Sequence, residues 1–195
     1  IIGIGVGLGA QSLVKDIING VFIILQDMIS VGDWVQVGAK SGLVEAIGLR
    51  ATRLRDGEGN VHIIPNSSID SVTNMTKVFS RYMFDVHVSY KEDVDRVMTV
   101  LEELGREMQA DTRYGPDILQ PLEIFGLDRF AESSIVIRAR VTTKPMKQWE
   151  IGREFNRRIK KIFDQSGIEM PFPHRTVCIE EVKGSHILPV DSAAR

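Results

Sequence analysis

Four glycines occupy every second position near the start of the chain, from Gly3 to Gly9, with Ile, Val and Leu between them. A phosphate-binding loop needs a strand before its glycines and an acidic residue about 20 positions after them. Only Ile1 and Ile2 precede the glycines, so this motif is weak. A strand is disfavoured as well, because interior glycines weaken a strand and leave one face without side chains. The stretch therefore favours a helix.

In a helix that turns about 100° per residue, Gly3 and Gly7 lie on one side, and Gly5 and Gly9 lie on the nearly opposite side. In lipid, such G-x-x-x-G stripes allow helix backbones to approach closely. Two opposed stripes give each helix a neighbour on both sides, which is the condition for a closed ring. The glycines thus predict a helix that packs against copies of itself. The alternative is a glycine-rich core helix in a soluble bundle.

The two faces between the glycine stripes differ in how they continue. One stays apolar, whereas the other carries Ile4 and Leu8 and then Gln11 and Lys15. Because the face that becomes polar is expected to meet water, we assign Ile4 and Leu8 to the lumen of a pore. After Lys15, polar residues alternate with apolar pairs, which predicts an amphipathic second half at the membrane interface. A bend near Gln11 to Lys15, or at Gly20, would separate the two halves.

Composition excludes several classes of function. A formal net charge of -2 opposes nucleic-acid binding by bulk electrostatics, and 43% hydrophobic residues are enough to build a core. The single cysteine, Cys178, excludes an intramolecular disulfide framework and a Cys-rich zinc site. The four histidines are scattered without metal-ligand spacing, so we expect no catalytic residue, no metal and no cofactor. Because the chain starts without Met, we also expect it to be part of a longer protein.

After Met28 the chain takes on the mixed charge of a soluble domain. Short apolar or alternating segments, WVQV, GLVEAIG, RATRLR and NVHIIP, are separated by turn residues and predict a small β-barrel. From about Arg81, the order strand, helix, strand, strand, helix predicts a two-layer α+β sandwich. Asp93 is the expected N-cap of its first helix, and Gly167 is the expected end of its second. The segment RTVCIEEV predicts one more strand.

Several motifs, in this order, resemble the MscS family of small-conductance mechanosensitive channels: GIGVGLGAQS, VGDWV, GLVEAIGLRATRLRDGEGNVHIIPNSSI and GIEMPFPHRTV. The resemblance implies a membrane α-helix followed by β and α+β cytosolic domains. In detail it implies a kinked pore-lining transmembrane helix, an Sm-like β-barrel, a ferredoxin-like α/β sandwich and a C-terminal strand in an intersubunit barrel. The corresponding ranges are 1–28, 29–79, 80–174 and 175–183, followed by a tail at 184–195.

The resemblance also implies a homoheptamer in the bacterial inner membrane, multi-pass, with its β and α/β domains in the cytoplasm. Such a channel opens under membrane tension and releases ions and small solutes on hypo-osmotic shock. Ile4 and Leu8 stand at the family's two rings of apolar gate residues. Gln11 matches the glutamine at the family's pore-helix kink, whereas Ser12 stands where some members have glycine, so Ser12 and Gly20 are both candidate hinges. The alternative function is a soluble Sm-like RNA-binding or assembly module, which the acidic balance and the glycine stretch oppose.

Overall fold

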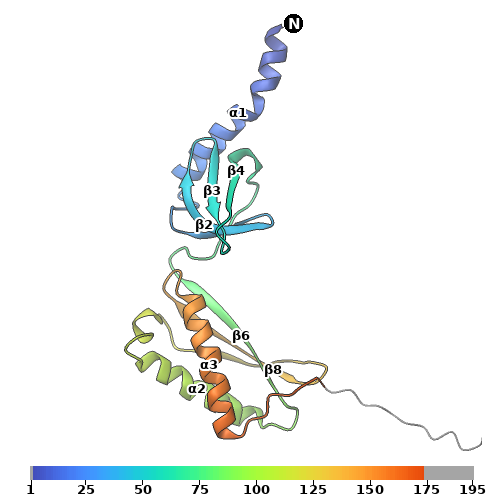
Figure 1. Cartoon of the computed structure of the whole chain (residues 1–195), viewed down its shortest axis with the longest axis vertical. Helices are drawn as coiled ribbons and strands as arrows, with labels where there is room; N and C mark the ends of the chain where they lie inside the picture. The colour runs from blue at the N-terminus through green and yellow to red at the C-terminus, as the bar shows by residue number, and fades with distance from the viewer. Residues whose placement is uncertain (1, 174–195) are drawn as a thin grey trace, which may run out of the picture.

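The computed structural model describes residues 2–173, with side chains described from residue 10 onward (Figure 1). A long N-terminal helix is followed by a five-stranded sheet and then by a three-stranded sheet with two long helices. In Figure 1 these parts follow one another along the long axis of the molecule, with the N-terminus at one end. The predicted strand at 175–183 and the tail at 184–195 lie outside the described residues.

Helix α1 spans Ile2–Leu25 and contains the whole glycine stretch, so the helical interpretation of that stretch is confirmed. The helix is continuous through Gln11, Ser12 and Gly20, although its axis changes direction partway in Figure 1. Within the described residues, no helix combines the length and the apolar character that are needed to cross a membrane.

The β unit is an antiparallel sheet with the strand order β4-β3-β2-β1-β5. Its strands are β1 (Trp34–Val37), β2 (Lys40–Ile47), β3 (Ala51–Arg55), β4 (Val61–Pro65) and β5 (Thr73–Asn74). A short 3-10 turn, η1 (Asn66–Ser68), follows β4 because Pro65 cannot donate to the ladder. Strands β4 and β5 form the two edges of this sheet, so closure into a barrel stays a prediction.

Alternate residues of the strands point into the core of the β unit, as expected for a sheet with one buried face. Helix α1 contributes to the same core. The buried apolar residues of this core are Ile23, Ile29, Val35, Val37, Val44, Leu54 and Ile64. Because Ile23 belongs to α1, the second half of the helix is docked on the sheet.

The α/β unit has the predicted order of strand, helix, strand, strand, helix. Its elements are β6 (Ser80–Val88), α2 (Val94–Ala110), the 3-10 turn η2 (Gly115–Asp117), β7 (Glu123–Phe130), β8 (Ile135–Thr143) and α3 (Gln148–Ser166). The strands pair antiparallel in the order β6-β8-β7, and α2 and α3 pack against one face of the sheet (Figure 1). The other face carries ion pairs, among them those of Asp85 with Arg129 and Arg138.

Both predicted helix boundaries in the α/β unit are confirmed. The Asp93 carboxylate accepts hydrogen bonds from the backbone N–H groups of Asp95 and Arg96, as an N-cap does. Gly167 ends α3 with a φ of 67°, in the left-handed region that glycine adopts without steric cost. These caps fix where each helix begins or ends over the sheet.

Candidate functional site: the junction of helix α1 and the β unit

The gate, packing and hinge residues predicted from the sequence lie along α1. Ile4 and Leu8 fall in its first turns, but their side chains lie outside the described ones, so the pore gate stays a prediction. The same holds for the packing residues of the glycine stretch: Gly3, Gly5, Gly7 and Gly9. Gln11 and Ser12 are exposed, whereas Gly20 is buried.

The second half of α1 meets the β unit along one stripe. Among the described side chains of this helix, the buried residues are Asp16, Gly20 and Ile23, which lie at i, i+4 and i+7. This spacing places all three on a single face of the helix. The face that docks is therefore partly polar, with one carboxylate and one glycine beside one isoleucine.

The Asp16 carboxylate is buried and bonded to the turn after β4. Its Oδ1 accepts a hydrogen bond of 2.8 Å from the backbone N–H of Ser67. The guanidinium Nε of Arg50 lies 3.9 Å from Oδ2. A buried carboxylate is costly unless donors and positive charge compensate for its lost hydration. Ser67 and Arg50 supply both, so the helix is held to η1 at this point.

Asn66 is the centre of the junction and is fully buried. Its Nδ2 donates to the carbonyl oxygens of Gly48 and Leu49, at 2.9 and 3.0 Å, and its Oδ1 accepts from the Thr52 hydroxyl at 2.9 Å. Its own carbonyl oxygen accepts from Asn19 Nδ2 of α1 at 3.2 Å. One side chain thus ties η1 to the β2–β3 loop and to β3, while its backbone binds the helix.

Gly20 allows the helix backbone to approach this loop. A Cβ atom at position 20 would lie 2.2 Å from the Leu49 carbonyl oxygen and 2.5 Å from Asn66 Nδ2. Real Cβ atoms do not come so close to such atoms, so only glycine fits without a shift of the helix. This close approach explains the glycine by packing, and a hinge at Gly20 stays a prediction.

The rest of the second half of α1 presents apolar side chains to the outside. These side chains, called here the outer apolar face, are between 39% and 74% exposed: Leu13, Val14, Ile17, Ile18, Val21, Phe22, Ile24 and Leu25. A helix surrounded by water buries its apolar residues and exposes its polar ones. Here the polar residues Asp16 and Asn19 contact the β unit, and the apolar ones face away. A continuous exposed apolar surface of this kind marks an interaction site.

The alternation of polar residues and apolar pairs after Lys15 predicts an amphipathic half, but it does not single out Asp16 and Asn19 as docking residues. The spacing of Asp16, Gly20 and Ile23 is the signal that could have revealed the docked face. Asn66 and Thr52 carried no such signal, because Asn after Pro is typical of an ordinary turn.

Two family models match the chain. "Mechanosensitive ion channel, beta-domain" matches residues 12–77, and "Mechanosensitive ion channel MscS, C-terminal" matches residues 83–170. A small-conductance mechanosensitive channel of Caldanaerobacter subterraneus is 40% identical over 184 residues, which cover 93% of this chain and 64% of the relative. The moderate conductance mechanosensitive channel YbiO of Escherichia coli is 31% identical over 170 residues, which cover 87% of this chain and 23% of the relative.

Among solved structures, the crystal structure of Helicobacter pylori MscS in its closed state matches with a TM-score of 0.77 and 25% identity. That match covers 92% of this chain and 70% of the other. The fold and the family models together define the class of protein, which is that of the mechanosensitive ion channels. Within this class the chain belongs to the MscS family, as its motifs predicted. It spans 64% and 23% of the lengths of the two curated relatives.

Proposed function

We propose that this chain is part of a tension-gated ion channel of the bacterial inner membrane. Helix α1, within residues 1–28, lines the pore, and the β and α/β units lie in the cytoplasm as an Sm-like barrel and a ferredoxin-like sandwich. The observation that carries the proposal is the outer apolar face of α1 opposite its polar docked face. A helix of this kind is suited to lie between lipid or other membrane helices on one side and a water-soluble domain on the other.

The mechanism requires no chemical step. Membrane tension favours the state that occupies more area in the plane of the membrane, so a ring of helices that tilt and separate is biased open. The two glycine stripes provide contacts between neighbouring copies in a homo-oligomer, which we propose to be a heptamer. Because Asp16 and Asn19 are hydrogen-bonded to η1 and Gly20 packs closely against the β2–β3 loop, the second half of the helix cannot move without moving these segments or breaking the junction.

The gate consists of the side chains of Ile4 and Leu8. A narrow apolar ring stops ions by excluding water before the pore is closed sterically. Ions and small solutes pass once the ring widens. The support for this assignment is the helical position of both residues and their match to the family motif GIGVGLGAQS. The family models and relatives give no support to the alternative of an RNA-binding module.

Patch recording under suction on membranes that carry the full-length protein tests the proposal. We expect currents that begin at a defined tension, and Leu8→Ser should hydrate the ring and lower that threshold. Leu119→Ser is the matched control, because Leu119 is 47% exposed in the α/β unit and far along the chain from α1. Absence of tension-activated current would overturn the proposed function. An unchanged threshold in Leu8→Ser would remove only Leu8 from the gate.

A further inference from the structure

The connection between the β unit and the α/β unit contains a strained turn. Val78 has a φ of 69°, and the backbone N–H of Phe79 donates to the carbonyl oxygen of Lys77 at 2.8 Å. A hydrogen bond from residue i+2 to residue i around a positive φ defines a rare and strained form of γ-turn. A β-branched residue is an outlier in this region. The Val78 side chain is 80% exposed, so its burial does not offset the strain.

The residue before this turn is fastened to the end of α1. Lys77 Nζ donates to Asp27 Oδ2 at 2.8 Å, to the Asp27 carbonyl oxygen at 2.9 Å and to Ser30 Oγ at 3.3 Å. These three acceptors match the three protons of an ammonium group. Asp27 follows α1 by two residues and itself has a φ of 48°. The end of the pore-lining helix and the start of the interunit turn thus share one ion pair.

The segment that leads to Lys77 is held along its length. Asn74 Nδ2 donates to Asp33 Oδ2 at 2.7 Å, and the backbone N–H of Trp34 donates to Thr76 Oγ1 at 2.8 Å. The backbone N–H of Met75 donates to the Trp34 carbonyl oxygen at 2.9 Å. Residues 74–77 therefore move with residues 27–34, and Val78 is the first position beyond these hydrogen bonds.

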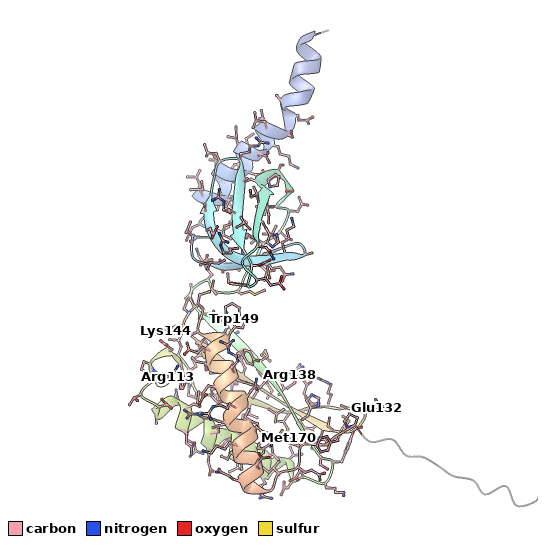
Figure 2. All side chains as sticks on the ribbon, in the orientation of Figure 1. Arg113, Glu132, Arg138, Lys144, Trp149 and Met170 are labelled. Carbon is pink, nitrogen blue, oxygen red and sulfur yellow. The ribbon has the colours of Figure 1, made fainter. Side chains whose placement is uncertain are left out.

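Beyond the turn, contacts reach from the β unit to the α/β unit. Ser80 Oγ, at the start of β6, donates to the Met75 carbonyl oxygen at 3.0 Å. The indole ring of Trp34 meets that of Trp149 edge to face, with ring centroids 5.1 Å apart. Trp149 lies at the end of α3 that is nearest to the β unit (Figure 2). The relative position of these two rings reports how the units are oriented.

We propose that the Asp27–Lys77 ion pair and the Val78 turn form a relay that transmits displacement of the end of α1 to the α/β unit. Asp27 and Lys77 are positioning residues. A strained turn persists only while its surroundings hold it, so a shift of Asp27 pulls Lys77 and changes the turn that sets the direction of β6. The gating role of this relay rests on the proposed function, because it presumes that α1 moves under tension.

The exposure of the ion pair makes it suitable for a test. The side chains of Lys77 and Asp27 are 36% and 71% exposed. An exposed pair contributes little to folding, and its removal changes an equilibrium by about two- to fivefold. Lys77→Met should therefore leave unfolding nearly unchanged while it loosens the orientation of the units.

The first measurement is circular dichroism of the full-length protein in lipid, without tension. Two indole rings in contact give an exciton-coupled signal, which Trp149→Phe identifies by its loss. We expect Lys77→Met and Val78→Pro to weaken this signal, the first by breaking the ion pair and the second because proline, fixed near a φ of about −65°, cannot adopt the 69° of this turn. Val78→Gly should keep the signal, because glycine adopts a positive φ without strain. The double variant Asp27→Lys with Lys77→Asp should restore it. Lys160→Met is the matched control, because it breaks the exposed ion pair with Asp164 on α3, away from the connection.

The second measurement is the opening tension of the same variants in membrane patches. The relay predicts a shifted threshold in Lys77→Met and recovery in the charge-swapped double variant. An unchanged exciton signal in Lys77→Met would overturn the relay, and so would a weakened signal with an unchanged threshold. Lack of tension-activated current in the parent protein would instead overturn the proposed function, and with it the gating role of the relay. The circular dichroism would still decide whether the ion pair orients the two units.

Discussion

Replacement of Gly20 by Ala tests whether the α1 junction depends on close backbone approach. The added Cβ atom would lie 2.2 Å from the Leu49 carbonyl oxygen, whereas ordinary van der Waals contact begins at 3.4 Å. The helix or the β2–β3 loop must therefore give way by about 1.2 Å, which is the difference between these two distances. Such a shift is enough to break hydrogen bonds of 2.8 to 3.0 Å in the junction, those of Asp16 with Ser67 and of Asn66 with Leu49.

The loss of docking free energy in Gly20→Ala follows from these hydrogen bonds. Two hydrogen bonds at about 1 kcal/mol each, with a further penalty of about 1 kcal/mol for a buried carboxylate left without its donor, sum to about 3 kcal/mol. The higher helix propensity of Ala returns about 1 kcal/mol. Gly20→Ala should thus weaken docking of α1 by about 2 kcal/mol, a factor of roughly 30 in the equilibrium between docked and undocked helix.

Amide hydrogen exchange at Ser67 is the direct assay, because this N–H is bonded to Asp16 of the helix. We expect exchange at Ser67 to be roughly 30-fold faster in Gly20→Ala than in the parent. Gly57→Ala is the matched control, since a Cβ at Gly57 meets nothing within 4 Å. Equal exchange at Ser67 in both variants would show that the helix does not approach the loop as closely as the structure has it.

Three further predictions concern other parts of the chain. Asn66→Ala removes three side-chain hydrogen bonds from a buried position and should destabilise the β unit by about 3 kcal/mol, measured as a lower denaturant midpoint. Hydrogen bonds from Arg157 and Arg158 lower the pKa of Glu154 to about 2, so the ionised carboxylate stabilises the fold above its unfolded pKa and this contribution is lost as the pH falls towards 2. Glu154→Gln should therefore lower the free energy of unfolding by about 1 kcal/mol at pH 7, and urea titrations should show this difference shrinking between pH 5 and pH 2. Gly7→Val places a branched side chain on a glycine stripe, so either native mass spectrometry should show that the ring does not assemble, or patch recording should show a shifted opening threshold. A parent-like result in both measurements would show that this stripe does not contact a neighbouring helix.

The local fold was predictable because local chemistry determines it. Asp93 and Gly167 mark helix boundaries through hydrogen bonds and a backbone conformation that depend on neighbouring residues only. The order of elements in the α/β unit follows from alternating and helical apolar spacing. The strand order of its sheet did not follow, because β6 pairs with the more distant β8 rather than with β7.

The junction was less predictable because its partners are distant in the sequence. Asp16 and Ser67 are 51 positions apart, and Asn19 and Asn66 are 47 positions apart. An amphipathic pattern distinguishes two faces of a helix but does not say which one is covered. In α1 the covered face includes Asp16 and Asn19, because the backbone N–H of Ser67 and the carbonyl oxygen of Asn66 satisfy their hydrogen bonds.

The pairing of β6 with β8 has a consequence for synthesis of the chain. Thr143 follows its partner Ser80 by 63 positions, so at about 5 to 20 residues per second β6 waits roughly 3 to 13 seconds before its partner has been made. During this interval its hydrogen-bonding edge is free to pair with other chains. Arg81 and Asp85 alternate with the core residues of β6 and discourage such pairing, because charged side chains on one face disfavour stacking of identical strands. Asp85, which forms ion pairs with Arg129 and Arg138 in the folded sheet, thus also protects the nascent strand against aggregation.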